Sequence, residues 1–488
     1  MDRWIGWLRP APGGHPRAPW WWTVAGLVAI LSLVGTQFVD APGLLERGDS
    51  WWRAAVSLPA LAVLLLAWWQ IGPRFRRQWI PSAVWSAPML MALPMYSRDA
   101  YAYAAQGWMV ARGVDPYTTA LGDAGQPGLL VGVHWFETTA VYPALSLELF
   151  GALAQLTGSH PYWTTVALRL PNLLALLLLG LVLRRLARRF ALDEGLVIWA
   201  GLTNPIMLIQ WVGGVHNDAL MVALGVAALL AATDLGWRGW RGLLVAGVLL
   251  GLAMGIKQSA ALYGLGVVAV AWAVRFRSWG AAPAVAGSDA HPARGSAAGW
   301  WRLALTAVVP GVVTIAVFAL TSLRFGFGWR SPTAGNPVGA MSNAPLSWVA
   351  EGLRYPLTDD AANSIVTAVS TLLILAAVAV AWVKLGPRGD DPRDPWAFAM
   401  AVLAAFCVLG PALQPWYLTW LLPLYVFWRT GARWHRAWLV VVVGFTLLPA
   451  LQTMMPPLIA MPLVAVPLGL LWRWMARAAV SPLPAAGR

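Results

Sequence analysis

The chain has 488 residues, of which 59% are hydrophobic and only 11% are charged. Soluble domains carry about a quarter charged residues to cover a polar surface, so this composition excludes a soluble globular protein. The net charge of +14 does not indicate a nucleic-acid partner, because the positive residues form short clusters between apolar runs. Cys407 is the only cysteine, which excludes an internal disulfide and a cysteine metal cluster.

Apolar runs recur along the whole sequence and predict an all-α polytopic membrane protein that forms a single membrane domain over residues 1–488. A spanning helix needs about 20 apolar residues to cross roughly 30 Å of hydrocarbon. The first run is too long for a signal-peptide core, so we interpret it as a retained span. About fourteen transmembrane helices are predicted, at 18–39, 52–71, 79–96, 163–183, 191–211, 217–236, 242–257, 259–274, 301–322, 363–384, 395–413, 416–428, 437–453 and 458–472.

The arginine-rich connections agree with this number of spans. If the N-terminus lies inside, every later basic cluster also falls on the cytoplasmic side, as the positive-inside rule requires. The sequence therefore predicts a multi-pass protein of the plasma membrane with cytoplasmic N- and C-termini. The clusters that decide this are Arg74–Arg77, Arg184–Arg189, Arg238–Arg241, Arg275–Arg277, Lys384–Arg393, Arg429–Arg436 and the tail from Arg473.

One apolar segment, 144–157, is not counted as a span. It would be about 14 residues and roughly 21 Å long as a helix, too short to cross, and it contains Glu148. We expect a short helix at the outer interface. Two long outer loops then follow, at 97–162 and 323–362, and loops of this length often carry function. The Ala/Gly/Ser-rich segment 278–300 is expected to be a flexible cytoplasmic linker.

The start of the first outer loop contains a candidate acid. Arg98, Asp99 and Tyr101 follow the third predicted span, where a carboxylate can be partly desolvated and still reachable by a polar substrate. The same spacing also fits interfacial charges flanked by an aromatic belt.

A second candidate cluster lies at an outer turn that begins with Gly213 and Gly214. His216, Asn217 and Asp218 follow this turn and offer donors and acceptors for a hydroxylated ligand. Capping of the next helix would account for Asn217 or Asp218, but it leaves His216 unexplained.

Two further outer-side candidates have competing explanations. Lys257 departs from the charge asymmetry of the other loops and is suited to hold a phosphate, although a lysine can also snorkel to lipid headgroups. Trp416 and Tyr417 could stack against a sugar or serve as interfacial anchors.

Metal-ligand spacing and nucleotide-binding loops are both missing from the sequence. No histidine or acidic pair has the spacing of a zinc site, and there is no Walker loop or G-x-G-x-x-G. We expect no resident cofactor and no nucleic-acid partner, and the sequence leaves assistance by a divalent cation open.

Taken in chain order, these motifs resemble the actinobacterial polyprenyl-phosphomannose-dependent α-1,6-mannosyltransferases of lipomannan synthesis, which belong to the GT-C superfamily of membrane glycosyltransferases. The resemblance covers roughly residues 80–430. It rests on the Arg-Asp at 98–99, Gly113 to Tyr117, Tyr142 to Leu145, Arg169-Leu170-Pro171, Asn204-Pro205, the Gly-Gly-x-His-Asn-Asp at 213–218 and Pro415-Trp416-Tyr417.

The resemblance implies a polyprenyl-monophosphate-mannose donor, a mannan or lipomannan-type glycolipid acceptor, and an active site on the outer face. An acidic residue of the first outer loop is the family's catalyst, and here it matches Asp99. The substrate-binding candidates are Arg98, Tyr101, Tyr142, His216, Asn217, Asp218, Lys257, Trp416 and Tyr417.

A single carboxylate suffices for this chemistry. A glycosyl phosphate already has a good leaving group, so only the acceptor hydroxyl needs a base, and Asp99 could accept its proton. One displacement on a β-linked donor gives an α product, with Lys257 and either Arg98 or His216 neutralising the phosphate. A protein O-mannosyltransferase, an arabinosyltransferase, a lipid or polysaccharide transporter and a non-catalytic scaffold are the alternatives.

Overall fold

The computed structural model describes residues 18–38, 51–233, 240–280, 297–331, 333–334, 342–387, 391–428 and 432–478. Within these ranges the regular structure is helical, and the only strand-like pairing is an isolated bridge between Thr139 and Ala334. The predicted all-α fold is therefore confirmed. Most of the predicted linker 278–300 lies outside the described residues, as do the residues before Ala18 and Arg429 of the cluster Arg429–Arg436.

Six described helical stretches are long and apolar enough to cross a membrane, which agrees with a membrane protein. A seventh crossing results if the stretches Glu194–Gly201 and Pro205–Gly213, bent by 49°, act as one broken span. The structure does not confirm about fourteen spans. The six belong to α2 (Ala18–Phe38), α3 (Trp51–Ile71), α9 (Pro161–Ala167) with α10 (Arg169–Arg189), α15 (Ala261–Gly280), α16 (Ala297–Thr321) and α18 (Asp359–Leu385).

The difference in number has two physical causes. Several predicted spans are apolar helices of fewer than 18 residues, namely α13 (Asp218–Ala231), α14 (Trp240–Ile256) and α19 (Asp394–Leu409). The predicted spanning helix at 416–428 is wrong, because that segment forms two 3₁₀ turns, η7 (Pro415–Trp420) and η8 (Leu422–Phe427). Each has a proline near its start, and a proline lacks the N–H that a continuous helix requires.

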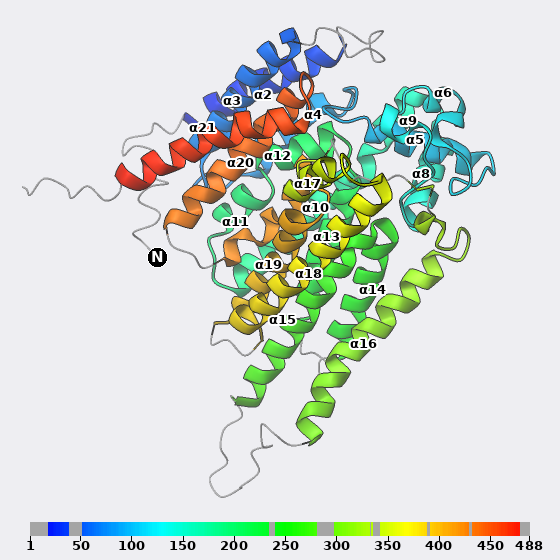
Figure 1. Ribbon diagram of the computed structural model, residues 1–488. Helices are drawn as coiled ribbons and strands as arrows, with labels where there is room; N and C mark the ends of the chain where they lie inside the picture. The colour runs from blue at the N-terminus through cyan, green and yellow to red at the C-terminus, as the bar shows by residue number, and fades with distance from the viewer. Residues whose placement is uncertain are drawn as a thin grey trace, which may run out of the picture.

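The helices form two groups that are visible in Figure 1. The first spans, α2 and α3, lie beside α20 (Ala432–Gln452) and α21 (Pro457–Ala478), near α4 (Trp79–Met89). The second group contains α13 to α16, α18 and α19. Within it α14 approaches α16 closely, because Gly247 and Gly251 place no side chain between the two backbones.

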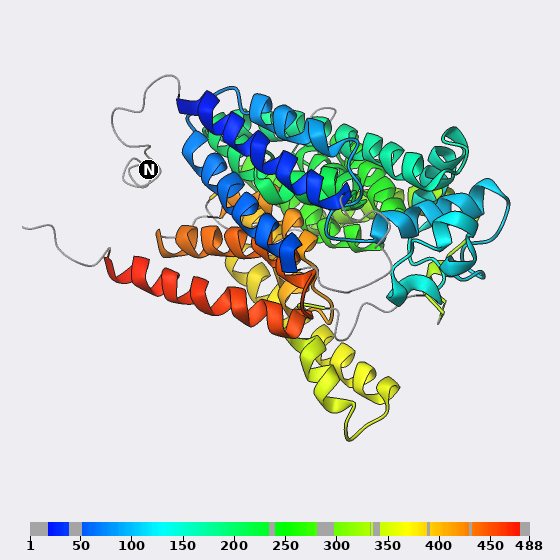
Figure 2. The same cartoon turned by 90° about the horizontal axis from the view of Figure 1, so that it is seen from above.

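The segment predicted to be the first outer loop, 97–162, folds into short helices that gather at one end of the molecule (Figures 1 and 2). They are α5 (Asp99–Ala111), α6 (Gly125–Gly128), α7 (Val133–Phe136) and α8 (Ala144–Leu156). The segment expected to be a short helix is α8, whose 13 residues are too few for a span. Gly107 of α5 faces the backbone of α8, and Gly151 of α8 faces Val110, so the two helices pack tightly.

The second outer loop lies against the first. The N–H of Thr139 donates to the carbonyl of Thr333 at 3.1 Å, and Arg324 pairs with Glu148 at 2.8 Å. The rest of this loop contains η6 (Gly328–Arg330) and α17 (Pro345–Leu353), and α17 leads into α18, which projects from the body in Figure 2.

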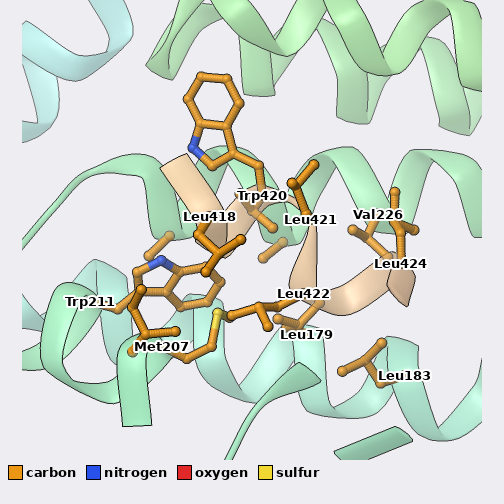
Figure 3. Close-up of a cluster of buried hydrophobic side chains, with 14 of the residues drawn as sticks. Leu179, Leu183, Met207, Trp211, Val226, Leu418, Trp420, Leu421, Leu422 and Leu424 are labelled. Carbon is orange, nitrogen blue, oxygen red and sulfur yellow. The ribbon is translucent and has the colours of Figure 1, made fainter. Parts of the chain in front are cut away.

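A core of apolar side chains fixes the backbone beneath the polar residues described below. Figure 3 shows Leu179 and Leu183 of α10 packed with Trp211, Val226 and Leu422. These residues come from α10, from the π-helical turn η3 (Ile209–Gly213), from α13 and from η8. The irregular segments η3 and η7–η8 are thus held by burial, although neither forms a regular α-helix.

Candidate active site

Asp99 is the first residue of α5 and lies in a tight local bend. Tyr96 has a φ of +61°, which is uncommon for a residue with a bulky side chain. The N–H of Asp99 then donates to Oγ of Ser97 at 3.1 Å. The Asp99 side chain is 14% exposed, so it is largely withdrawn from water but still accessible.

His216 faces Asp99 from the other side of the site. It follows Val215, whose φ of +62° is strained for a β-branched residue. Nδ1 of His216 lies 3.7 Å from Oδ2 of Asp99, and its ring stacks on Trp416 with centroids 3.9 Å apart. Neither ring nitrogen has a hydrogen-bond partner among the described residues.

Asp218 and Lys257 form a buried ion pair next to these groups. Oδ1 of Asp218 accepts hydrogen bonds from Nζ of Lys257 at 2.8 Å and from Nε1 of Trp420 at 2.7 Å. The ammonium also lies over the rings of Tyr417 and Trp420, at 5.0 and 5.4 Å. Oδ2 of Asp218 has no partner among the described residues. Lys257 is therefore not a free cation, since a carboxylate already balances its charge.

Tyrosines from the first outer loop close the side of the site. The hydroxyls of Tyr103 and Tyr142 are 3.3 Å apart, and the Tyr117 hydroxyl donates to the Tyr142 carbonyl at 2.7 Å. The Tyr103 ring stacks on Phe150 of α8. This chain of contacts ties the Tyr142 loop to α5 and α8, so the wall beside Asp99 has a defined position.

Burial sets the protonation states of the two facing groups. Desolvation raises the pKa of Asp99 to about 6, and the charge of Asp218 adds to this, whereas Lys257 and hydrogen bonds from Ser97 and Trp135 oppose it. Burial, aided by the positive charge of Lys257, holds the pKa of His216 well below its usual value. At neutral pH the site therefore contains a carboxylate able to accept a proton beside a neutral imidazole.

Most of the predicted site residues lie together. Asp99, His216, Asp218, Lys257, Trp416 and Tyr417 are linked by the contacts and charge interactions above, and the charges of Lys257, Asp99 and Asp218 also act on the hydroxyl of Tyr142. Asn217 lies beside them as the N-cap residue of α13, but its side chain forms no capping hydrogen bond and instead donates from Nδ2 to Oγ of Ser146 at 3.5 Å.

The contacts described above do not include two of the candidates, Arg98 and Tyr101. Arg98 flanks the start of α5, and its charge acts on the buried hydroxyl of Tyr101. The cation whose charge acts on Asp99 is Lys257. The sequence placed Tyr101 at the site, but the tyrosine that reaches Tyr142 is Tyr103, two residues further along α5 and on another face of the helix.

Four residues of the site escaped the sequence interpretation. Tyr103 lies two residues after the predicted Tyr101, Trp420 lies three residues after the predicted Tyr417, and Arg169 belongs to a motif that carried the family resemblance. Nothing in the spacing indicated that these three side chains would lie at or beside the site. Trp135 hydrogen bonds to Asp99 from the short helix α7, and no sequence signal indicated this contact.

The arrangement is suited to a hydroxylated ligand. Both nitrogens of His216, Oδ1 of Asn217 and Oδ2 of Asp218 are buried without a partner among the described residues, whereas buried polar groups normally form hydrogen bonds. A small cavity beside them is lined by Tyr103, Ser146 and Asn217 among others. No three His, Cys, Asp or Glu side chains within the described ranges are placed to hold a metal ion.

Comparisons with known proteins identify the family of this chain. Residues 21–274 match the family model described as alpha-(1->6)-mannopyranosyltransferase, N-terminal domain. Alpha-(1->6)-mannopyranosyltransferase A of Corynebacterium glutamicum is 30% identical over 353 residues, which cover 69% of this chain and 68% of the relative. The probable alpha-(1->6)-mannopyranosyltransferase of Mycolicibacterium smegmatis is 28% identical, over 79% of this chain and 72% of its own length.

A third relative, alpha-(1->6)-mannopyranosyltransferase A of Mycobacterium tuberculosis, is 28% identical over 74% of this chain and 68% of its own length. No solved structure matches the chain. The family match covers more than half of the chain, including Asp99, His216, Asp218 and Lys257. The chain therefore belongs to the alpha-(1->6)-mannopyranosyltransferase family and is a mannosyltransferase.

Proposed function

We propose that the protein transfers mannose from a polyprenyl-monophosphate donor to a mannan or lipomannan-type glycolipid on the outer face of the plasma membrane, forming an α-1,6 linkage. The observation that carries the proposal is the buried carboxylate of Asp99, whose pKa of about 6 suits a general base. It lies 3.7 Å from a neutral histidine, in a cluster of unpartnered polar atoms.

In this mechanism the acceptor hydroxyl attacks the anomeric carbon of the donor while its proton passes to Asp99. The bond between the anomeric carbon and the phosphate oxygen breaks, and the polyprenyl phosphate leaves with the electron pair. A phosphate leaving group needs no protonation, so the site needs only the carboxylate that acts as base. Glycosidases need a second carboxyl group to protonate their leaving group. A β-linked donor gives an α-linked product through this single inverting displacement.

Lys257 supports the departing phosphate as half of an ion pair. One of its N–H groups is used by Asp218 at 2.8 Å, and the remaining N–H groups are available as donors to a phosphate oxygen. The neutral imidazole of His216 supplies one further N–H. The donor phosphate thus accepts hydrogen bonds from Lys257 and His216 and lies near the Lys257 ammonium. These interactions stabilise the negative charge that develops on the phosphate as it leaves.

The positions of charged residues support an outer active site and cytoplasmic termini. Helix α10 begins with Arg169, close to the site, and ends with Arg188 and Arg189. Its 21 residues correspond to about 30 Å, the thickness of the hydrocarbon core. Under the positive-inside rule the arginine-rich end is cytoplasmic, so the site at the opposite end faces outward. The polyprenyl tail can then stay in the bilayer while the sugar reaches Asp99.

The test uses membranes that contain wild type, Asp99→Asn or Asp123→Asn, supplied with radiolabelled polyprenyl-phosphomannose and a short mannoside. We expect Asp99→Asn to lose transfer by about 10²–10⁴-fold, the usual contribution of a general base. Asp123 is an exposed aspartate of the same loop, so Asp123→Asn should behave as wild type.

Full transfer by Asp99→Asn would remove Asp99 from the catalytic role. If wild type transferred mannose to no mannoside, the acceptor class would be wrong. Parallel reactions with a serine/threonine peptide and with a polyprenyl-phosphoarabinose donor separate this function from related transferases.

A further inference from the structure

Arg169 is a fully buried arginine that the proposed chemistry does not use. Its side chain is 1% exposed at the start of α10. Within the described part of the chain, no carboxylate lies within ion-pairing distance of its guanidinium. A buried charge is costly unless hydrogen bonds satisfy it, so a fully buried arginine without an acidic partner calls for an explanation.

The guanidinium instead donates to backbone carbonyls of three segments. Nε donates to Val212 at 2.8 Å, and Nη2 donates to Ala92 at 2.7 Å and to Gly213 at 3.4 Å. Nη1 donates to Thr165 at 3.0 Å, within its own helical stretch. The flat, branched guanidinium is suited to reach several acceptors at once, which the single ammonium of a lysine cannot do in the same way.

Three of these carbonyls, those of Ala92, Val212 and Gly213, lie at the ends of two helical segments. Ala92 follows α4, and Val212 and Gly213 end the π-helical turn η3. The last carbonyls of a helix have no partner inside the helix and must find one elsewhere. Asn172, one turn further along α10, donates to a third carbonyl of η3, that of Trp211, at 2.6 Å.

The two segments held by Arg169 lead directly into the site. Seven residues after Ala92 comes Asp99, and three residues after Gly213 comes His216. The N–H of Met95 also donates to the Gly213 carbonyl at 3.0 Å, so the two segments touch where Arg169 binds both. A residue with positive φ precedes each active group, Tyr96 on one side and Val215 on the other. Such strained conformations persist only where surrounding contacts enforce them.

We infer that Arg169 is a positioning residue that holds the Asp99 segment and the His216 segment in register, so that the two side chains face each other across the site. The effect of Arg169 on catalysis rests on the proposed function. The hydrogen bonds by which Arg169 braces the two segments, which form the Arg169 brace, do not depend on the reaction. A shift of about 1 Å in a reacting group can cost about 100-fold in rate. Loosening the brace should therefore reduce turnover more than it reduces donor binding.

The test compares Arg169→Lys with Arg275→Lys, a control that replaces another buried arginine, on α15. Each purified full-length variant is analysed by hydrogen–deuterium exchange over peptides 92–99 and 209–218, a measurement that needs no substrate. We expect Arg169→Lys to speed exchange in both peptides and Arg275→Lys to change neither. Unchanged exchange in either peptide of Arg169→Lys would overturn the inference.

Kinetics provide the second measurement. In Arg169→Lys we expect kcat to fall by about 100-fold, with the KM for the donor within threefold of wild type. The acid limb of the pH profile should move to lower pH, because water admitted beside Asp99 relieves its desolvation. A variant that was merely less folded would lose activity without moving this limb, and that result would contradict the inference.

Asn172→Ala is the milder variant if Arg169→Lys does not fold. It removes one donor from the end of η3 and leaves Arg169 in place. We expect faster exchange in 209–218 alone, and no change there would count against the brace. If wild type transfers no mannose while Arg169→Lys still loosens both peptides, the proposed function fails and the brace stands.

Discussion

The buried ion pair of Asp218 and Lys257 leads to a prediction about stability: removing either partner should destabilise the protein. Their atoms are 2.8 Å apart, with side chains 0% and 11% exposed, so solvent screens the pair little. Removing one partner of a buried ion pair leaves an uncompensated charge, which costs about 3–5 kcal/mol of stability. We expect a loss of this size for Asp218→Asn and for Lys257→Met, measured as thermal or denaturant unfolding in detergent.

The double variant Asp218→Asn/Lys257→Met should be more stable than the sum of the two losses implies, because no unpaired charge remains. The difference from additivity measures the coupling within the pair. An additive double variant would show that the two side chains do not depend on each other, and the geometry described above would then be wrong.

The same variants should shift the pH dependence of transfer in opposite directions. Activity requires ionised Asp99, so kcat/KM falls as the pH drops through its pKa of about 6. Lys257 lowers this pKa and Asp218 raises it, with the larger effect from Lys257. The acid limb should therefore move to higher pH in Lys257→Met and, by a smaller step, to lower pH in Asp218→Asn. Shifts in the same direction would refute the assignment of Asp99 as the titrating base.

Three further changes test other parts of the structure. Trp420→Phe removes the N–H that donates to Asp218 at 2.7 Å, and should cost about 1.5–3 kcal/mol in unfolding experiments; an unchanged midpoint would contradict this bond. Gly107→Ala forces a side chain against α8 and should destabilise by about 1–3 kcal/mol, whereas Gly352→Ala, with open space around it, should not. A cysteine replacing Glu148 should react with an impermeant reagent added outside intact cells, and labelling only after permeabilisation would reverse the proposed orientation.

The sequence predicted the helical fold and much of the site because both depend on strong local signals. Long apolar runs identify helices, and Gly213-Gly214 before His216 identifies a turn with polar side chains. Charge asymmetry also identified Lys257 as unusual. These signals are visible without knowing which distant segments meet.

The features that could not be predicted from the sequence depend on contacts between distant segments. Nothing local shows that Lys257 would be neutralised by Asp218, or that Asp218 would also bind a residue 202 positions away. Hydropathy likewise gave a span at 416–428, because apolar composition does not distinguish a crossing helix from 3₁₀ turns buried in a protein core. The orientation of a helix face, which separates Tyr101 from Tyr103, also requires the packed structure.

The long separation between Trp420 and Asp218 has a consequence for biosynthesis. A ribosome adds about 5–20 residues per second, so roughly 10–40 s pass between the synthesis of Asp218 and the synthesis of Trp420. Through most of that interval the nascent chain contains Asp99, His216 and Lys257, but not the segment Pro415–Trp420, whose Trp416 stacks on His216 and whose Trp420 donates to Asp218. The site must therefore be completed late, after most of the helices have been made. If synthesis stopped between Lys257 and Trp420, the membrane would contain a chain whose charged site residues lack their aromatic partners, and such a chain is a substrate for membrane proteases.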